Sequence, residues 1–105
     1  MSDQQPQALS QQQKQYFRKL GHDLGPVVTI GSKGLVESVL AELQRALKDH
    51  ELIKIKLNVD DRKAVIAELC EQTGAELVQA IGATALIFKA ADKPNPKLSN
   101  LLRQR

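Results

Sequence analysis

The chain has 105 residues, of which 42% are hydrophobic and 26% are charged, and its formal net charge at pH 7 is +3. This length suits one compact domain with a core of its own, and the apolar content excludes a chain that is disordered throughout. An aromatic content of 3% and a single cysteine exclude a base-stacking platform of many rings, an internal disulfide and a cysteine-rich zinc site.

The first predicted element is a helix that begins near Ser10 and ends at about Gly21. The hydroxyl of Ser10 can cap the helix, and a glycine–proline pair soon after its end turns the chain. The helix has a basic side made of three residues, Lys14, Arg18 and Lys19, and three residues that can pack inward, Tyr16, Phe17 and Leu20. Residues 1–9 before it are polar, so we expect them to be disordered.

A short strand over about Val27–Ile30 comes next, and the glycine-rich loop Gly31-Ser32-Lys33-Gly34 follows it directly. Apolar residues at four-residue spacing then predict a helix from about Leu35 to Asp49. After this helix, apolar residues alternate with Lys54 and Lys56, which predicts a strand with one buried and one exposed face.

A third helix is predicted over about Arg62–Thr73, with Asp60 or Asp61 as its N-terminal cap and Gly74 as its C-terminal stop. Cys70 falls among the apolar positions of this helix, so we expect a buried and unreactive thiol.

Two short strands, about Leu77–Ile81 and Thr84–Phe88, flank a tight turn whose first residue is glycine. Residues 91–105 are rich in basic groups, and we expect a flexible tail there. Three leucines in this tail could form a short terminal helix: Leu98, Leu101 and Leu102.

The expected order of elements is therefore α-β-α-β-α-β-β, within one domain of residues 10–90. Alternating strands and helices favour parallel crossovers, while the final hairpin is antiparallel, so the four-stranded sheet is mixed. If one sheet face is polar, the two crossover helices share the other face, which gives a two-layer α/β fold.

Positive charge is concentrated in the glycine loop and the terminal segments. Residues 1–34 carry a net charge of +2, residues 35–88 carry −3, and residues 89–105 carry +4. This asymmetry is typical of proteins that bind polyanions, although basic tails also serve solubility.

The loop Gly31–Gly34 has the features of a phosphate cradle. Glycines let a ligand come close to the backbone, the N-terminus of the next helix offers unpaired N–H groups, and Lys33 adds a positive charge. The alternative is a tight connection that needs glycine only for its dihedral angles. A nucleotide-hydrolysing P-loop is a poor alternative, because the GxxxxGK[ST] spacing is absent.

Several segments in the right order resemble the CRM domain, a family of small RNA-binding domains, and the chain looks like the bacterial stand-alone member. The segments that carry the resemblance are Leu24–Val28, Ile30–Leu35, His50–Lys56, Thr73–Ala75 and Val78–Gly82. The resemblance implies a fold similar to the C-terminal domain of translation initiation factor 3. It also implies binding to structured RNA, and association with precursors of the large ribosomal subunit.

By motif match, the RNA-contacting GxxG of the family corresponds to Gly31, Ser32, Lys33 and Gly34. The chain departs from the family pattern at two positions. Val36 stands where a hydroxyl residue often caps the second helix. Lys89 stands where an arginine often follows the last strand, and lysine keeps the charge but loses the planar fork of arginine.

Other basic residues are candidate RNA contacts with alternatives left open. Lys14, Arg18 and Lys19 could line an RNA groove or form a merely solvated helix face. Lys54 and Lys56 could contact RNA or protect an exposed strand from edge pairing. His22 and His50 lack the spacing of metal ligands.

The sequence thus predicts a cytoplasmic, monomeric, non-enzymatic RNA-binding protein that assists assembly of the large ribosomal subunit. Its partners would be ribosomal RNA and precursor particles, with no membrane, no small-molecule substrate, no cofactor and no metal. One alternative is a protein-interaction module that docks through the tail leucines. An RNA-processing enzyme is weakly supported, because no acid–base pair or activated nucleophile can be assembled.

Overall fold

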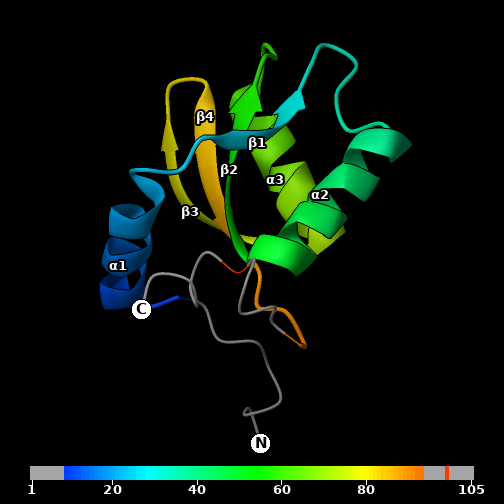
Figure 1. Cartoon of the computed structure of the whole chain (residues 1–105). Helices are drawn as coiled ribbons and strands as arrows, with labels where there is room; N and C mark the ends of the chain where they lie inside the picture. Colours follow the sequence, from blue (N-terminus) through cyan, green and yellow to red (C-terminus); the bar gives the residue numbers. More distant parts are fainter. Residues whose placement is uncertain (1–8, 94–98, 100–105) are drawn as a thin grey trace, which may run out of the picture.

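The computed structural model describes residues 9–93 and 99 of the chain. Its elements are, in order, α1 (Gln11–Gly21), β1 (Pro26–Ile30), α2 (Glu37–His50), β2 (Leu52–Leu57), α3 (Arg62–Thr73), β3 (Glu76–Ile81) and β4 (Thr84–Phe88) (Figure 1). The predicted order of elements and the α/β fold class are confirmed. Among the described residues, no helix has the length and apolar character needed to cross a membrane.

Local hydrogen bonds explain where α1 and α3 begin. Ser10 Oγ accepts a hydrogen bond from the Gln13 N–H at 3.1 Å, and Gln13 Oε1 accepts one from the Ser10 N–H at 2.9 Å, so the two residues form a capping box. At α3, Asp61 Oδ1 accepts a hydrogen bond from the Ala64 N–H at 3.1 Å. The predicted bounds of both helices are confirmed, because their start signals are local.

The start of α2 differs from the prediction, because the helix begins at Glu37 and not at Leu35. The Val36 N–H donates to the Gly34 carbonyl at 3.0 Å, and Val36 itself has an extended backbone (φ −75°, ψ 166°) as the N-cap. Leu35 and Val39 continue the four-residue apolar spacing across this turn. Periodicity therefore could not separate the turn from the helix.

The four strands form one mixed sheet in the order β1-β2-β4-β3. β1 and β2 are parallel and connected through α2, while β4 is antiparallel to both of its neighbours. Gly82 opens the turn between β3 and β4 with a φ of +55°, so the predicted glycine-first hairpin is confirmed.

The sheet has two ends that matter for the site. The end at which β1 and β2 finish, next to the β3–β4 turn, is called the loop end. There the Leu57 N–H donates to the Ala83 carbonyl at 2.6 Å and the Asn58 N–H donates to the Ile30 carbonyl at 2.8 Å. We call the opposite end the Glu51 end, because Glu51 lies just before β2 and β4 finishes beside it with Leu52 paired to Phe88.

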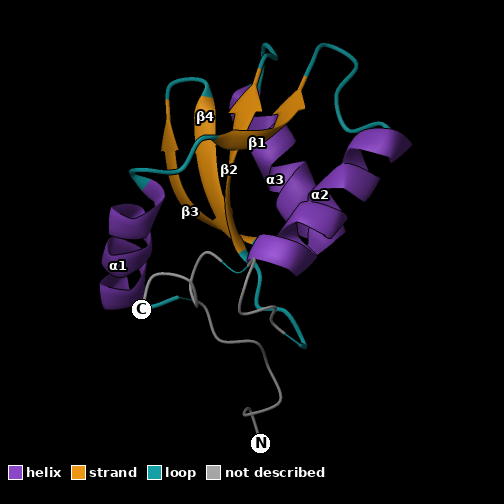
Figure 2. Cartoon of the chain, viewed as in Figure 1, coloured by secondary structure: helices purple, strands orange, loops and turns teal. Residues whose placement is uncertain are grey.

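Helices α2 and α3 cover one face of the sheet, as predicted (Figure 2). The main core lies between them and the sheet. It joins Leu43 and Leu47 of α2 with Ile66 and Leu69 of α3 and the inward side chains of β1, β2 and β4. All four helix residues are buried, and the burial of such apolar side chains is the main favourable contribution to folding.

Helix α1 covers part of the opposite face, so the prediction of an exposed second face is only partly right. Phe17 packs against Leu52, Val78 and Leu86 in a second buried cluster. Lys56 on the same face is exposed. Alternation within one strand could not predict that a helix from elsewhere in the chain covers part of that face.

Tyr16 corrects a further expectation, because 52% of its surface is exposed. It precedes the buried Phe17 by one residue, and neighbouring residues on a helix differ by about 100° in direction. Its ring therefore lies at the border of the packed side rather than within it.

Glu51 ties the chain after β4 to the domain. Its backbone has a φ of +63°, and its carbonyl accepts a hydrogen bond from the Lys89 N–H at 2.9 Å. Its buried carboxylate accepts hydrogen bonds from the Ala91 N–H at 2.8 Å and from Ser99 Oγ at 2.7 Å. The predicted tail is therefore anchored at residues 91 and 99.

The remaining predictions about the two ends of the chain concern residues that the structure does not describe. This applies to disorder of residues 1–8, to the flexibility of residues 94–98 and 100–105, and to the short helix with Leu98, Leu101 and Leu102. Leu9 is described, and its N–H donates to Glu76 Oε2 at 3.0 Å.

Candidate nucleic-acid interface

The glycine loop projects beyond the loop end of the sheet, between β1 and α2 (Figure 1). The Gly31 carbonyl accepts a hydrogen bond from the Gly34 N–H at 2.9 Å. This bond closes a four-residue turn and places Ser32 and Lys33 at its tip, where both side chains are exposed. The Lys33 ammonium forms no ion pair with any residue that the structure describes, so its charge is directed to solvent.

The two glycines of the loop have different structural needs. Gly34 has a φ of +74°, a conformation that side chains with a Cβ rarely adopt. Gly31 has no positive φ, and a Cβ added there would meet no atom within 4 Å. The turn geometry therefore accounts for glycine at position 34 and leaves glycine at position 31 without a structural reason.

The start of α2 provides unpaired backbone donors behind this turn. Val36 makes no side-chain cap, and the first intrahelical bond runs from the Leu40 N–H to the Val36 carbonyl at 3.0 Å. The N–H groups of residues 37–39 have no acceptor within the described part of the chain. Because Val36 has no hydroxyl group, we expected α2 to lack a side-chain cap, and this is confirmed.

Glu37 limits what this helix end can bind. Its carboxylate lies in the first turn of α2, where it complements the positive end of the helix dipole. The same charge repels a phosphate placed directly on the helix N-terminus. The turn Gly31–Gly34, with Lys33 at its tip, is therefore the better anion-binding part of this segment.

The basic residues of α1 divide into two groups. Lys14 and Arg18 are four residues apart, share one side of the helix and are half-buried. Lys19 is exposed and points about 100° away from Arg18. The exposed ring of Tyr16 is a further candidate contact that charge counting missed, because the sequence pattern placed it inward.

Lys54 and Lys56 lie on the face of the sheet that α1 partly covers. Lys54 is half-buried opposite Leu86, and the exposed Lys56 pairs with Thr29 on one side and Thr84 on the other. β2 lies between β1 and β4 in the sheet. The alternative that these lysines protect an edge strand is therefore wrong, while RNA contact stays a prediction.

Lys89 lies away from the glycine loop, because β4 ends at the Glu51 end of the sheet. Its Cε and Nζ lie 3.5 and 3.6 Å from the position that a Cβ on Gly74 would take, so the side chain reaches the C-terminus of α3. The structure thus groups the loop at one end, Lys54 and Lys56 with α1 on one face, and Lys89 at the other end.

The remaining candidate side chains come from different elements of the fold. His22 is exposed after α1, and His50 is the last residue of α2. Burial, and to a lesser degree the charge of Glu76, raises the pKa of the half-buried Cys70 thiol. Within residues 9–93 and 99, no group of three histidine, cysteine or acidic side chains could hold a metal ion.

Comparisons with known proteins cover most of the chain. Residues 9–89 match the family model of the CRS1/YhbY (CRM) domain. A Pseudomonas aeruginosa protein named as a probable RNA-binding protein is 52% identical over 99 residues, which cover 91% of this chain and 95% of that protein. An RNA-binding protein of Haemophilus influenzae is 40% identical over 93 residues, which cover 86% of this chain and 94% of that protein.

A solved structure has the same fold. The solution structure of a hypothetical Staphylococcus aureus protein, described as a candidate for RNA binding, matches with a TM-score of 0.71 and 35% sequence identity. The match covers 82% of this chain and 93% of that one.

Proposed function

The chain belongs to the CRS1/YhbY (CRM) domain family, as its motifs predicted, and we propose that it is an RNA-binding protein without enzymatic activity. The names of its relatives in Pseudomonas aeruginosa and Haemophilus influenzae support RNA as the ligand. The described residues offer charge and open backbone rather than a reactive centre, which supports a binding role.

Gly31 is the observation that carries the proposal. Its φ is not positive, and a Cβ added there would meet no atom within 4 Å, so neither the sign of φ nor the surrounding space requires glycine there. A missing side chain on an exposed turn allows a ligand to approach the backbone closely. Together with the unpaired charge of Lys33, this favours a phosphate of the RNA backbone as the ligand.

The mechanism is contact with RNA shape and backbone. Lys33 and the turn Gly31–Gly34 hold phosphates at the loop end, while Lys54, Lys56 and the basic side of α1 provide a second set of contacts on the sheet face. Tyr16 offers one exposed ring, which is too little for a stacking platform. Phosphate contacts of this kind carry little sequence information, so structured RNA is the expected ligand.

We further propose that the ligand is ribosomal RNA in precursors of the large ribosomal subunit, and that the protein assists their assembly. This finer proposal is supported by the family resemblance of the sequence. It includes a cytoplasmic location and a monomeric state, which suit a protein that binds assembling particles.

The proposal is tested by measuring the affinity for transcribed large-subunit ribosomal RNA between 50 and 200 mM salt, with roughly one log unit of affinity lost per log unit of salt for each phosphate contact. The Lys33→Glu variant should bind more weakly and should show a salt dependence shallower by about one unit. Small-subunit ribosomal RNA serves as the competitor. Equal affinity for both RNAs would contradict the large-subunit assignment, and a salt-independent association would contradict the mechanism.

Gly31→Ala separates RNA contact from folding. Gly25 is the matched control, because a Cβ added there also meets no atom within 4 Å and its φ is not positive. Both alanine variants should have the Tm of the wild-type protein, and only Gly31→Ala should bind RNA more weakly. Unchanged affinity of Gly31→Ala would remove backbone approach at this position from the mechanism.

A further inference from the structure

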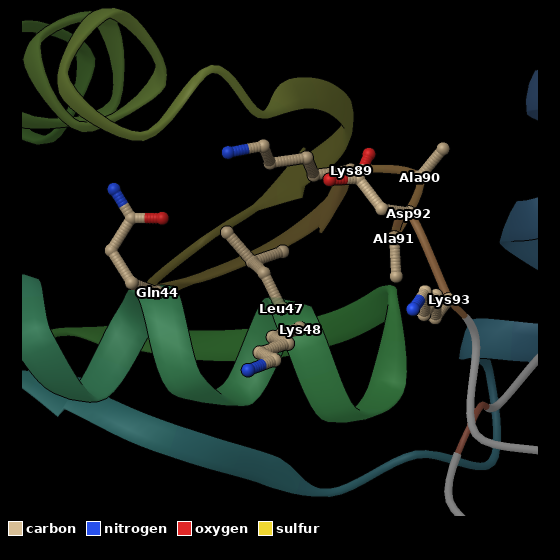
Figure 3. A pocket seen from close by; sticks show the side chains of 8 residues that line it. All are labelled: Gln44, Leu47, Lys48, Lys89, Ala90, Ala91, Asp92 and Lys93. Atoms are coloured by element: carbon tan, nitrogen blue, oxygen red, sulfur yellow. The ribbon is translucent and has the colours of Figure 1, made fainter.

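A pocket of about 470 Å³ opens at the Glu51 end of the sheet, opposite the glycine loop (Figure 3). It lies between the last turns of α2, the end of β4 and the segment that follows β4. Lys48 comes from α2, Lys89 from the end of β4 and Lys93 from the segment after it. A volume of this size is within the range of roughly 300–1,000 Å³ that small-molecule sites occupy.

The charge around the pocket is positive. Three lysines line it against one carboxylate, that of Asp92. None of the three ammonium groups forms an ion pair with a residue in the described part of the chain. Unpaired like charges around a concave surface raise the local potential and attract anions.

Helix dipoles explain part of this arrangement. Lys48 lies in the last turn of α2, and the Lys89 ammonium lies near the C-terminus of α3, so each complements a negative helix end. Lys93 comes from the segment after β4 and is exposed next to the end of α2 (Figure 3). The three lysines thus bring positive charge to one pocket from three separate segments.

The rest of the lining is suited to more than a bare anion. The floor is apolar and includes Leu47 and the methyl group of Ala91. Gln44 adds an amide that can both donate and accept hydrogen bonds, as the edge of a nucleobase requires. In Figure 3, Gln44 rises from α2 on one side of Leu47, and Lys89 extends above it from the end of β4.

Glu51 holds one wall of this pocket in place. Its carbonyl fixes the Lys89 N–H at 2.9 Å, and its carboxylate fixes the Ala91 N–H at 2.8 Å. The Glu51 N–H in turn donates to the Leu47 carbonyl at 2.8 Å, which joins the wall to the floor. A pocket held in this way loses little freedom when a ligand binds.

We propose that this pocket binds a nucleotide, which the positive charge of Lys48, Lys89 and Lys93 attracts and whose base lies against Leu47, Ala91 and Gln44. The nucleotide is either a unit of bound RNA, in which case the inference rests on the proposed function, or a free nucleotide. A site of this kind is separate from the turn Gly31–Gly34, because the two lie at opposite ends of the sheet.

The test follows the amide resonances of Ala90 and Ala91 in the full chain by NMR. The probes are adenosine monophosphate, inorganic phosphate and a twelve-nucleotide single-stranded RNA. Lys48→Glu combined with Lys93→Glu should weaken binding at these amides by about tenfold. Lys93→Glu alone is the second variant, since it changes no helix, and Lys63→Glu at the start of α3 is the matched control.

Shifts caused by adenosine monophosphate and lost in the pocket variants assign a free-nucleotide site. Shifts caused only by the RNA and lost in the same variants assign a contact with bound RNA. The proposal is overturned if neither adenosine monophosphate nor the RNA shifts these amides, if Lys63→Glu loses as much binding, or if inorganic phosphate binds as tightly as the nucleotide. RNA affinity that falls in Lys33→Glu but not in the pocket variants overturns the RNA contact and leaves the proposed function intact.

Discussion

Replacing Val36 by threonine should stabilise the protein, because Val36 is an N-cap residue that cannot cap. Its backbone already has the extended conformation of an N-cap, with φ −75° and ψ 166°. The Val39 N–H, three residues on, has no acceptor in the described part of the chain. A threonine hydroxyl at position 36 can accept a hydrogen bond from this group without a change in the backbone.

The expected gain follows from two opposing effects. A threonine cap stabilises a helix by about 1 kcal/mol relative to a residue that cannot cap. Val36 is 38% exposed, so exchanging one of its methyl groups for a hydroxyl loses about 0.5 kcal/mol of burial. The net gain of about 0.5 kcal/mol should raise Tm by roughly 2–4 °C in a domain of this size.

Thermal unfolding followed by circular dichroism measures this shift, with Val36→Ala as the control that removes methyl groups and adds no cap. Val36→Ala should lower Tm, because about 1 kcal/mol of burial is lost without compensation. Hydrogen exchange of the Val39 amide should slow in the threonine variant. A threonine variant that melts no higher than wild type, with unchanged exchange at Val39, would show that the first turn of α2 does not need a cap.

Three further predictions concern single contacts. Gly34→Ala should lower the free energy of unfolding by about 1–2 kcal/mol in chemical denaturation, because its φ of +74° becomes strained although the space around it is open. Glu76→Gln should speed alkylation of Cys70 by iodoacetamide. Burial, and then the charge of Glu76, raise the pKa of this thiol, so removing that charge lowers the pKa and increases the fraction of reactive thiolate. Ser99→Ala should lower Tm and reduce the free energy of unfolding by about 1–3 kcal/mol, because it leaves the buried Glu51 carboxylate without one of its hydrogen-bond donors.

The raised pKa of Cys70 also determines how the stability of the protein changes with pH. The pKa of this thiol is raised in the folded state, so folding favours the protonated form. The stability that this adds is fully present below the unfolded pKa and is lost as the pH rises through the folded pKa. Stability measured against pH should therefore decline on the alkaline side in wild type, and less so in a Cys70→Ser variant.

Local signals made most of the fold predictable from the sequence. The bounds of α3 follow from Asp61 at its start and Gly74 at its end, and both signals act within a few residues. The start of α2 was missed because Gly34 and Val36 form a hydrogen-bonded turn inside an apolar stripe that continues unbroken. An apolar period reports which side chains share a face, and it does not report where the backbone becomes helical.

The candidate site was only partly predictable, because its geometry depends on strand order. The edge-strand explanation for Lys54 and Lys56 failed when β4 proved to lie beside β2. The position of Lys89 follows from the same pairing, which is set between segments more than 25 residues apart in the chain. Residue types and spacing identify charged groups, but only the pairing of strands shows which of them lie together.

This strand order also limits how RNA can bind. Because β4 is antiparallel to β2 and β2 is parallel to β1, a loop that follows β1 and a residue that follows β4 must lie at opposite ends of the sheet. Strands of five and six residues separate these ends by roughly 17–20 Å, at about 3.3 Å per residue. No single phosphate can contact both Lys33 and Lys89 over that length. If both residues bind RNA, they therefore contact different phosphates of it.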